Sequence, residues 1–125
     1  MIVLDKVFKN KEITLENIYY DYDKWNIRPD AEPSLNQLVK ILNENPSIRI
    51  ELASHTDCRG DSDYNGSLSA KRAQSAVYYL MQNGIDASRL DARGYGEERP
   101  AINCVCDDCT EDEHQANRRT TFTIR

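Results

Sequence analysis

Apolar residues along this chain repeat with two different periods, and the longer period predicts two helices. The first helical stripe has members at i, i+3, i+4 and i+7, namely Leu35, Leu38, Val39 and Leu42. Either Pro29 or Pro33 can lie in the first turn of that helix, and the Asn45-Pro46 pair ends it. A second stripe predicts a helix that stops at Asn83-Gly84, and its members are Ala73, Ala76, Val77, Leu80 and Met81.

Segments rich in β-favouring or alternating residues predict four strands around these helices. The strands are expected within 12–23, 47–54, 90–100 and 118–125, which gives the order β-α-β-α-β-β. Two strand–helix–strand crossovers imply parallel pairings, and the closing strand is expected to add an antiparallel one. We therefore predict an α+β two-layer sandwich with a mixed parallel/antiparallel sheet and two main helices on one face.

Length and charge limit the classes of function. A chain of 125 residues fits a single domain, which we place over 1–125. The net charge of −5 and the lack of a basic cluster argue against nucleic acid as a partner. No apolar run is long enough to enter a membrane, and no signal-peptide pattern follows Met1. The chain is expected to be either cytosolic or a domain excised from a longer exported protein.

The richest polar pattern lies between the second strand and the second helix. Asp57 comes just after the strand, and Arg72 flanks the apolar stripe of the helix so that it can lean back toward Asp57. The start of the helix also offers free N–H groups that accept a carboxylate. This arrangement favours a ligand with both an ammonium and a carboxylate, such as an amino acid. The alternative is structural: Asp57 pairs with Arg72, and Asn65 or Ser67 is an ordinary N-cap.

The same stretch resembles the peptidoglycan-binding motif of OmpA-like domains, T-D-x-x-G followed by Y-N-x-x-L-S-x-x-R-A. The matching residues are Thr56, Asp57, Gly60, Tyr64, Asn65, Leu68, Ser69, Arg72, Ala73 and Val77. Three further segments, 18–31, 84–100 and 117–124, resemble the family in the same order. The resemblance covers about residues 12–125 and therefore nearly the whole chain.

The resemblance implies a module that binds peptidoglycan through the diaminopimelate of its stem peptide. Asp57 is then expected to accept the ligand's ammonium, and Arg72 to bind its side-chain carboxylate. Thr56 and Asn65 either bind the ligand or hold the loop, and Leu68 packs on its methylenes. Arg118 faces the same pocket while Arg119 points away, because strand side chains alternate. Two residues at the end of the first strand, Asp21 and Tyr22, are expected to form the near wall.

The resemblance also implies where the domain works and with what. We expect it in the periplasm, associated with the outer membrane through further parts of a longer protein, where it tethers that protein or an assembly to the cell wall. Its partner is the peptidoglycan stem peptide, with no nucleic acid, no direct membrane insertion, no cofactor and no resident metal. Some relatives dimerise, so a homodimer is possible.

Four cysteines separate this chain from the broad family pattern. They are Cys58, beside Asp57, and Cys104, Cys106 and Cys109 in one loop. Cys104 and Cys106 are too close to pair. This leaves Cys58–Cys104 with Cys106–Cys109, or Cys58–Cys106 with Cys104–Cys109, and we favour the second because the Cys106–Cys109 ring is very tight. Zinc bound with His114 is the competing use of these cysteines, and the family's periplasmic setting favours disulfides.

Two other functions compete with the binding module. A cell-wall hydrolase would need acid–base groups, for which Asp57, Glu97 and His55 are candidates, but no nucleophile with a base and an orienting group is evident. Cys58 could act as a nucleophile only outside a disulfide. The third possibility is a structural interaction domain in which the Asp57–Arg72 pair is internal. We predict a domain that is not an enzyme.

Overall fold

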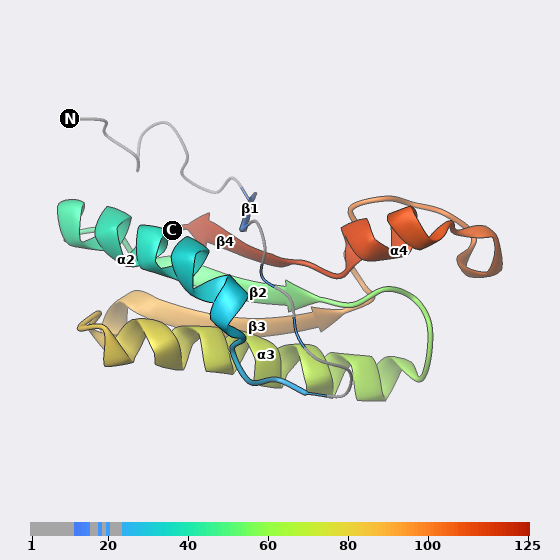
Figure 1. The fold of residues 1–125 in the computed structure, drawn as a ribbon, viewed down its shortest axis with the longest axis horizontal. Helices are drawn as coiled ribbons and strands as arrows, with labels where there is room; N and C mark the ends of the chain where they lie inside the picture. The colour runs from blue at the N-terminus through green and yellow to red at the C-terminus, as the bar shows by residue number, and fades with distance from the viewer. Residues whose placement is uncertain (1–11, 16–17, 19, 21–23) are drawn as a thin grey trace.

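A computed structural model describes residues 12–15, 18, 20 and 24–125, and Figure 1 shows its fold. The strands are β1 (Glu12–Leu15), β2 (Ile50–His55), β3 (Leu90–Gly96) and β4 (Thr120–Ile124). The helices are α2 (Glu32–Glu44), α3 (Ser62–Gln82) and α4 (Glu111–Asn117). Three short 3-10 turns complete the described elements: η1 (Pro29–Ala31), η2 (Ala87–Arg89) and η3 (Cys106–Asp108).

The described strands form one mixed sheet in the order β1-β4-β2-β3. β2 is parallel to β3, and β4 is antiparallel to both β2 and β1. The predicted fold class is confirmed, but only one of the two expected parallel pairings is direct. β1 runs in the same direction as β2, but the two strands do not pair directly. β4 lies between them and is hydrogen-bonded to both. The last strand of the sequence is therefore an inner strand of the sheet.

Both main helices contribute to a single core with the sheet. Leu35, Leu38 and Leu42 of α2 are almost fully buried, as the helical stripe predicts. They join buried side chains of α3, β2 and β4, namely Ala76, Val77, Leu80, Ile50, Leu52, Phe122 and Ile124. η1 begins at Pro29 and Pro33 lies in the first turn of α2, and Gly84 follows the end of α3 with a positive φ of 94°.

The start of α3 is fixed by an unusually close approach to β3. A Cβ added at Gly94 would lie 2.1 Å from the backbone nitrogen of Ala70, so only glycine fits there. Two residues further along β3, the N–H of Gly96 donates to Ser69 Oγ at 2.9 Å. In Figure 1, α3 begins at the same end of the sheet where β2 and β3 finish and where α4 lies. The close contact therefore positions the helix start beside the carboxyl end of β2.

Two disulfides lie at that same end of the sheet. Cys58 is bonded to Cys106 and Cys104 to Cys109, the pairing that the sequence analysis favours. The first bond ties the β2–α3 loop to the segment just before α4, across 48 positions of the sequence. In the part of the chain that the structure describes, none of the helices has the length and apolarity needed to cross a bilayer.

Candidate functional site

A cavity of about 710 Å³ opens at the carboxyl end of β2. Six of the predicted site residues line it: Thr56, Asp57, Asn65, Leu68, Arg72 and Arg118. The other lining residues are Ile18, Tyr20, Arg28, Ser54, His55, Arg59, Gly60, Tyr64, Gln115 and Arg119. The remaining two predictions, Asp21 and Tyr22, lie outside the described residues.

Asp57 is a buried carboxylate held by two arginines. Its Oδ2 accepts from Arg118 Nη1 at 2.6 Å and from Arg59 Nη2 at 2.8 Å, and its Oδ1 accepts the backbone N–H of Arg59 at 2.9 Å. Burial alone would raise the pKa of Asp57, but the hydrogen bonds from Arg59 and Arg118 outweigh it and lower the pKa to about 2. Asp57 is therefore a permanent negative charge on the cavity wall at neutral pH.

Arg72 reaches the cavity from the third turn of α3. Its Nε donates to the carbonyl oxygen of Lys24 at 2.9 Å, and its guanidinium lies 4.7 Å from the centre of the Tyr20 ring. The Tyr20 hydroxyl in turn donates to the Arg72 carbonyl at 3.1 Å. These contacts fix the guanidinium at the rim. The structural alternative required Asp57 to pair with Arg72, whereas the ion pairs that Asp57 makes join it to Arg59 and Arg118.

Thr56 and Asn65 hold the binding loop in shape. Thr56 Oγ1 donates to the Asp57 carbonyl at 2.9 Å, and its backbone N–H donates to the Gly96 carbonyl at 2.8 Å. Asn65 Nδ2 donates to the Arg59 carbonyl at 2.9 Å. The sequence analysis expected these residues either to bind the ligand or to hold the loop, and the contacts seen here are those that hold the loop.

The start of α3 differs from the sequence prediction. The helix begins at Ser62, and its N-cap is Asp61 rather than Asn65 or Ser67. Asp61 Oδ1 accepts the N–H groups of Asp63 at 2.8 Å and of Tyr64 at 3.4 Å. The capping aspartate therefore already satisfies amides that were expected to receive a ligand carboxylate. Anion recognition in this cavity then depends on arginine side chains.

Arg118 and Arg119 have different partners, but both line the cavity, so Arg119 does not point away from it as expected. Arg118 points to Asp57, while Arg119 donates to the Arg99 carbonyl at 2.9 Å and to Glu12 Oε1 at 3.2 Å. Arg118 Nη2 also donates to Glu111 Oε1 at 2.9 Å and to Gln115 Oε1 at 2.8 Å, so α4 carries its partners.

Charge in the cavity contrasts with charge on the whole chain. Five arginines line it, Arg28, Arg59, Arg72, Arg118 and Arg119, and the only carboxylate among the lining residues that the structure describes is Asp57. The chain as a whole carries −5. The described lining therefore carries more guanidinium groups than carboxylates, and this combination suits a ligand that carries carboxylates and one ammonium.

The comparison with protein families matches residues 19–118 to the OmpA family. This span is most of the chain and includes the loop, α3 and Arg118. The chain belongs to the OmpA family. Membership in this family, with relatives of the peptidoglycan-associated lipoprotein type, agrees with the prediction of a domain that is not an enzyme.

Two named proteins are similar in sequence to this OmpA-family chain. It is 37% identical to the peptidoglycan-associated lipoprotein of Mesorhizobium japonicum, over 87% of this chain and 62% of that protein. It is 38% identical to a Gloeobacter violaceus protein named photosystem I P700 chlorophyll a apoprotein A2, over 88% of this chain and 13% of that protein. The chain thus spans less than two thirds of either relative.

A solved structure shows the same fold. The crystal structure of the peptidoglycan-associated lipoprotein from Burkholderia pseudomallei matches with a TM-score of 0.76 and 27% identity. The match covers 86% of this chain and 88% of that one. The four-stranded mixed sheet and its helices are therefore the OmpA-like fold.

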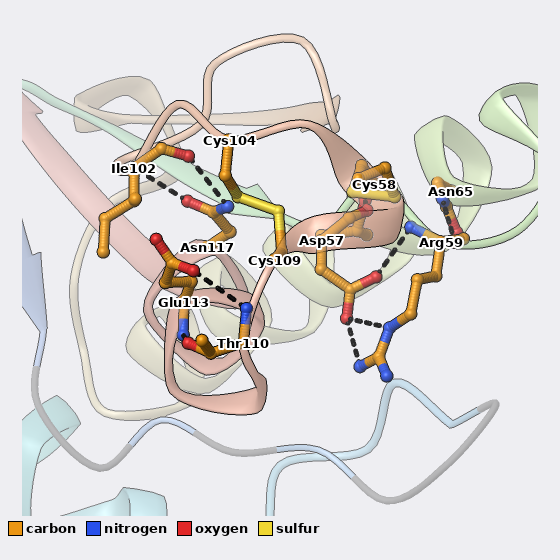
Figure 2. Close-up of a disulfide and its surroundings, with 12 residues drawn as sticks. Asp57, Cys58, Arg59, Asn65, Ile102, Cys104, Cys109, Thr110, Glu113 and Asn117 are labelled. Carbon is orange, nitrogen blue, oxygen red and sulfur yellow. Dashed lines mark hydrogen bonds and ion pairs between the residues drawn. A yellow bond between two sulfur atoms is a disulfide. The ribbon is translucent and has the colours of Figure 1, made fainter.

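Two site residues escaped the sequence analysis. Arg59 occupies a variable position of the T-D-x-x-G motif, and Figure 2 shows its side chain folded back onto Asp57. Glu111 lies in the first turn of α4, where its carboxylate receives Arg59 as well as Arg118. The signal for Arg59 was present, because an aspartate commonly accepts the N–H two residues later and so turns the chain back. Nothing in the sequence pattern pointed to Glu111, since it lies 52 positions from Arg59 in the chain.

The cysteine cluster also bears on metal binding. Ligand atoms of Cys58, Cys109 and His114 all lie within 4.8 Å of one another. Both cysteines are in disulfides, however, and a metal needs the thiolate. Figure 2 shows the Cys104–Cys109 bond beside the capping box of α4, formed by Thr110 and Glu113. The cluster in this structure therefore acts as a covalent support for the loop before α4.

Proposed function

We propose that this domain binds peptidoglycan non-covalently through the diaminopimelate of the stem peptide. The observation that carries the proposal is the composition of the cavity at the end of β2. There an ionised Asp57 and the guanidinium of Arg72 line one cavity, on a chain of the OmpA family. The side chain of diaminopimelate ends in an ammonium and a carboxylate, which match these two charges.

Each charged residue has a role that follows from its chemistry. Asp57 accepts hydrogen bonds from the ligand's ammonium, and Arg72 meets the side-chain carboxylate with its planar fork of donors. Each such charge-assisted bond contributes on the order of 1.5–3 kcal/mol. Leu68, exposed over only 9% of its surface, offers an apolar contact to the ligand's methylenes. Arg118 supports Asp57 from the other side.

Four further residues complete the proposed site. Thr56 and Asn65 keep the loop in its binding conformation through the backbone contacts described above. Asp21 and Tyr22, which precede Lys24 in the chain, remain our candidates for the near wall of the pocket. We assign no cofactor and no metal to this function.

The wider setting is proposed from the relatives. A domain of this kind, over residues 1–125, would tether a longer outer-membrane protein or an assembly to the cell wall in the periplasm. Two curated proteins that support this setting are named peptidoglycan-associated lipoprotein and outer membrane porin F. A homodimer is compatible with the proposal, and neither nucleic acid nor membrane insertion has a part in it.

A pull-down with purified diaminopimelate-type sacculi tests the proposal. Asp57→Asn and Arg72→Ala are the test variants. Asp91→Asn and Arg93→Ala are the matched controls, because both residues are exposed on β3 and neither lines the cavity. We expect the test variants to lose retention on the sacculi by at least about 10-fold, since each removes a charge-assisted bond. The controls should be retained like the unmodified domain.

The alternatives give other results in the same experiment. A purely structural domain would show no retention for any variant, and Asp57→Asn would register only as a loss of stability. A hydrolase would release soluble muropeptides from the sacculi. Equal retention of all variants would place wall binding elsewhere on the surface.

A further inference from the structure

Oδ2 of Asp57 has no hydrogen-bonding capacity left for a ligand. A carboxylate offers about four lone-pair sites. Oδ1 accepts the backbone N–H of Arg59 at 2.9 Å. Oδ2 accepts three donors: Arg118 Nη1 at 2.6 Å, Arg59 Nη2 at 2.8 Å and Arg59 Nε at 3.3 Å. An incoming ammonium can therefore reach Oδ2 of Asp57 only when one of its three donors leaves.

The two arginines on Asp57 differ in how easily they can leave. The Arg118 side chain is 30% exposed, and its Nη2 is also held by Glu111 and Gln115. The Arg59 side chain is 50% exposed and extends from the loop itself. Its two side-chain bonds to Asp57 can break while its backbone N–H remains on Oδ1. Arg59 is thus the donor that a ligand would displace at the lower cost.

A second carboxylate, that of Glu111, lies beside Arg59. Glu111 Oε2 lies 3.3 Å from Arg59 Nη1, while Nη2 of the same guanidinium lies on Asp57. Glu111 is exposed, and its pKa is lowered chiefly by the hydrogen bond from Arg118, so it is ionised at neutral pH. A small rotation of the guanidinium would exchange Asp57 for Glu111. The Cys58–Cys106 bond keeps the loop and the segment before α4 together during this exchange.

We propose that Arg59 is an internal substitute for the ligand's ammonium, which covers Asp57 until the ligand binds and then stays on Glu111 alone. This inference rests on the proposed function, since it concerns the same cavity and the same ligand. It assigns Arg59 and Glu111 a role in affinity. The ligand's ammonium competes with the tethered guanidinium of Arg59 for Asp57. The measured affinity is therefore lower than it would be without Arg59, in proportion to the fraction of molecules in which Arg59 has left Asp57.

The test is calorimetric titration of the domain with a soluble muropeptide that contains diaminopimelate. Arg59→Met removes the competing cation and keeps an unbranched apolar chain in place of the aliphatic part of arginine. Arg93→Met makes the same change of charge at an exposed position of β3 outside the cavity. We expect Arg59→Met to lower the Kd about 3- to 10-fold, because the ligand's ammonium no longer has to displace the Arg59 guanidinium from Asp57. Arg93→Met should leave the Kd unchanged.

A modified ligand separates competition from any general effect of charge. When the side-chain amine of the diaminopimelate is acetylated, no ammonium remains to compete with Arg59. The gain from Arg59→Met should then disappear. Glu111→Gln should weaken binding of the unmodified ligand, and should do so less in the Arg59→Met background, because the two residues act together.

Each outcome decides between the two claims. Binding by the unmodified domain with an equal or higher Kd in Arg59→Met would overturn the role of Arg59 and leave the proposed function standing. No binding by either protein would overturn both. If Arg59→Met fails to fold, NMR of the unmodified domain replaces it: the Nε–H signal of Arg59 should shift on titration while its backbone N–H signal is retained. An unmoved Nε–H signal at saturation would overturn the inference.

Discussion

Asp57 and His55 lie two residues apart at the end of β2, and their surroundings keep each in one charge state. Asp57 stays ionised because two arginines donate to it. His55 stays neutral because burial, and then the nearby charge of Arg119, lower its pKa to about 4. Its ring stacks on Tyr95 with 5.5 Å between centroids, and Nε2 lies 3.3 Å from Thr121 Oγ1. His55 is therefore part of the support beneath the loop.

Neutral burial of His55 predicts a loss of stability in mild acid. The folded-state pKa is about 4, below the ordinary value of 6.5, so the unfolded chain takes up the proton first as the pH falls. The free energy of unfolding should therefore drop by about 2 kcal/mol between about pH 7.5 and pH 5. Urea unfolding at the two pH values measures this drop.

The His55→Gln variant is the control for that effect. Glutamine keeps a polar group for Thr121 but does not titrate, so the drop between the two pH values should largely vanish. The charged neighbours of His55, Glu12, Arg119 and Arg99, stay in place in this variant. An equal drop in the variant would assign the pH dependence to another group.

At the level of single residues, the sequence predicted which side chains meet but not all of their partners. Seven positions of the loop motif do line one cavity, because the motif places them on either side of one strand–helix turn. The partners of Asp57 were beyond such reasoning. Arg59 occupies a variable motif position, and Glu111 approaches only because the chain folds α4 against the loop. Charges brought together by tertiary structure leave no local pattern in the sequence.

At the level of elements, the contact between α3 and β3 decides where the cavity lies. Gly94 and Gly96 let the backbone of α3 lie directly on β3, and Ser69 bridges the two. The periodicity of apolar residues predicted both elements well. It could not predict that β4 would lie between β1 and β2, because strand order depends on which edges pair and not on the pattern within any strand.

The close approach yields a prediction about Gly94. A methyl group there would lie 2.1 Å from Ala70 N, and the helix backbone cannot yield as a flexible side chain would. Gly94→Ala should lower the free energy of unfolding by about 3 kcal/mol or more. It should also weaken retention on the wall, because α3 carries Arg72. Thermal or urea unfolding measures the first effect.

Gly66→Ala is the matched control for Gly94→Ala. Gly66 lies in α3, and a Cβ there meets nothing within 4 Å. Because alanine favours a helix over glycine, this variant should gain about 0.5–1 kcal/mol. A loss of similar size in both variants would mean that the spacing of α3 and β3 is not the constraint described here.

At the scale of the whole molecule, the functional groups gather at one end of the sheet. The carboxyl ends of β2 and β3, the start of α3 and α4 meet there, while the C-terminus lies at the opposite end (Figure 1). The two disulfides join the loops at the same end. The core formed by α2, α3 and the sheet supports this end without contributing charge to it. An acidic chain thereby presents an arginine-lined cavity at this end of the sheet.

The measurement that tests this account most directly compares retention of the domain on diaminopimelate-type and lysine-type sacculi. The two stem peptides differ at the side chain by the carboxylate that we assign to Arg72. We predict retention on the diaminopimelate wall, weak or no retention on the lysine wall, and loss of the difference in Arg72→Ala. Equal retention on both walls would contradict the account, because the arginines of the cavity would then not read the ligand's carboxylate.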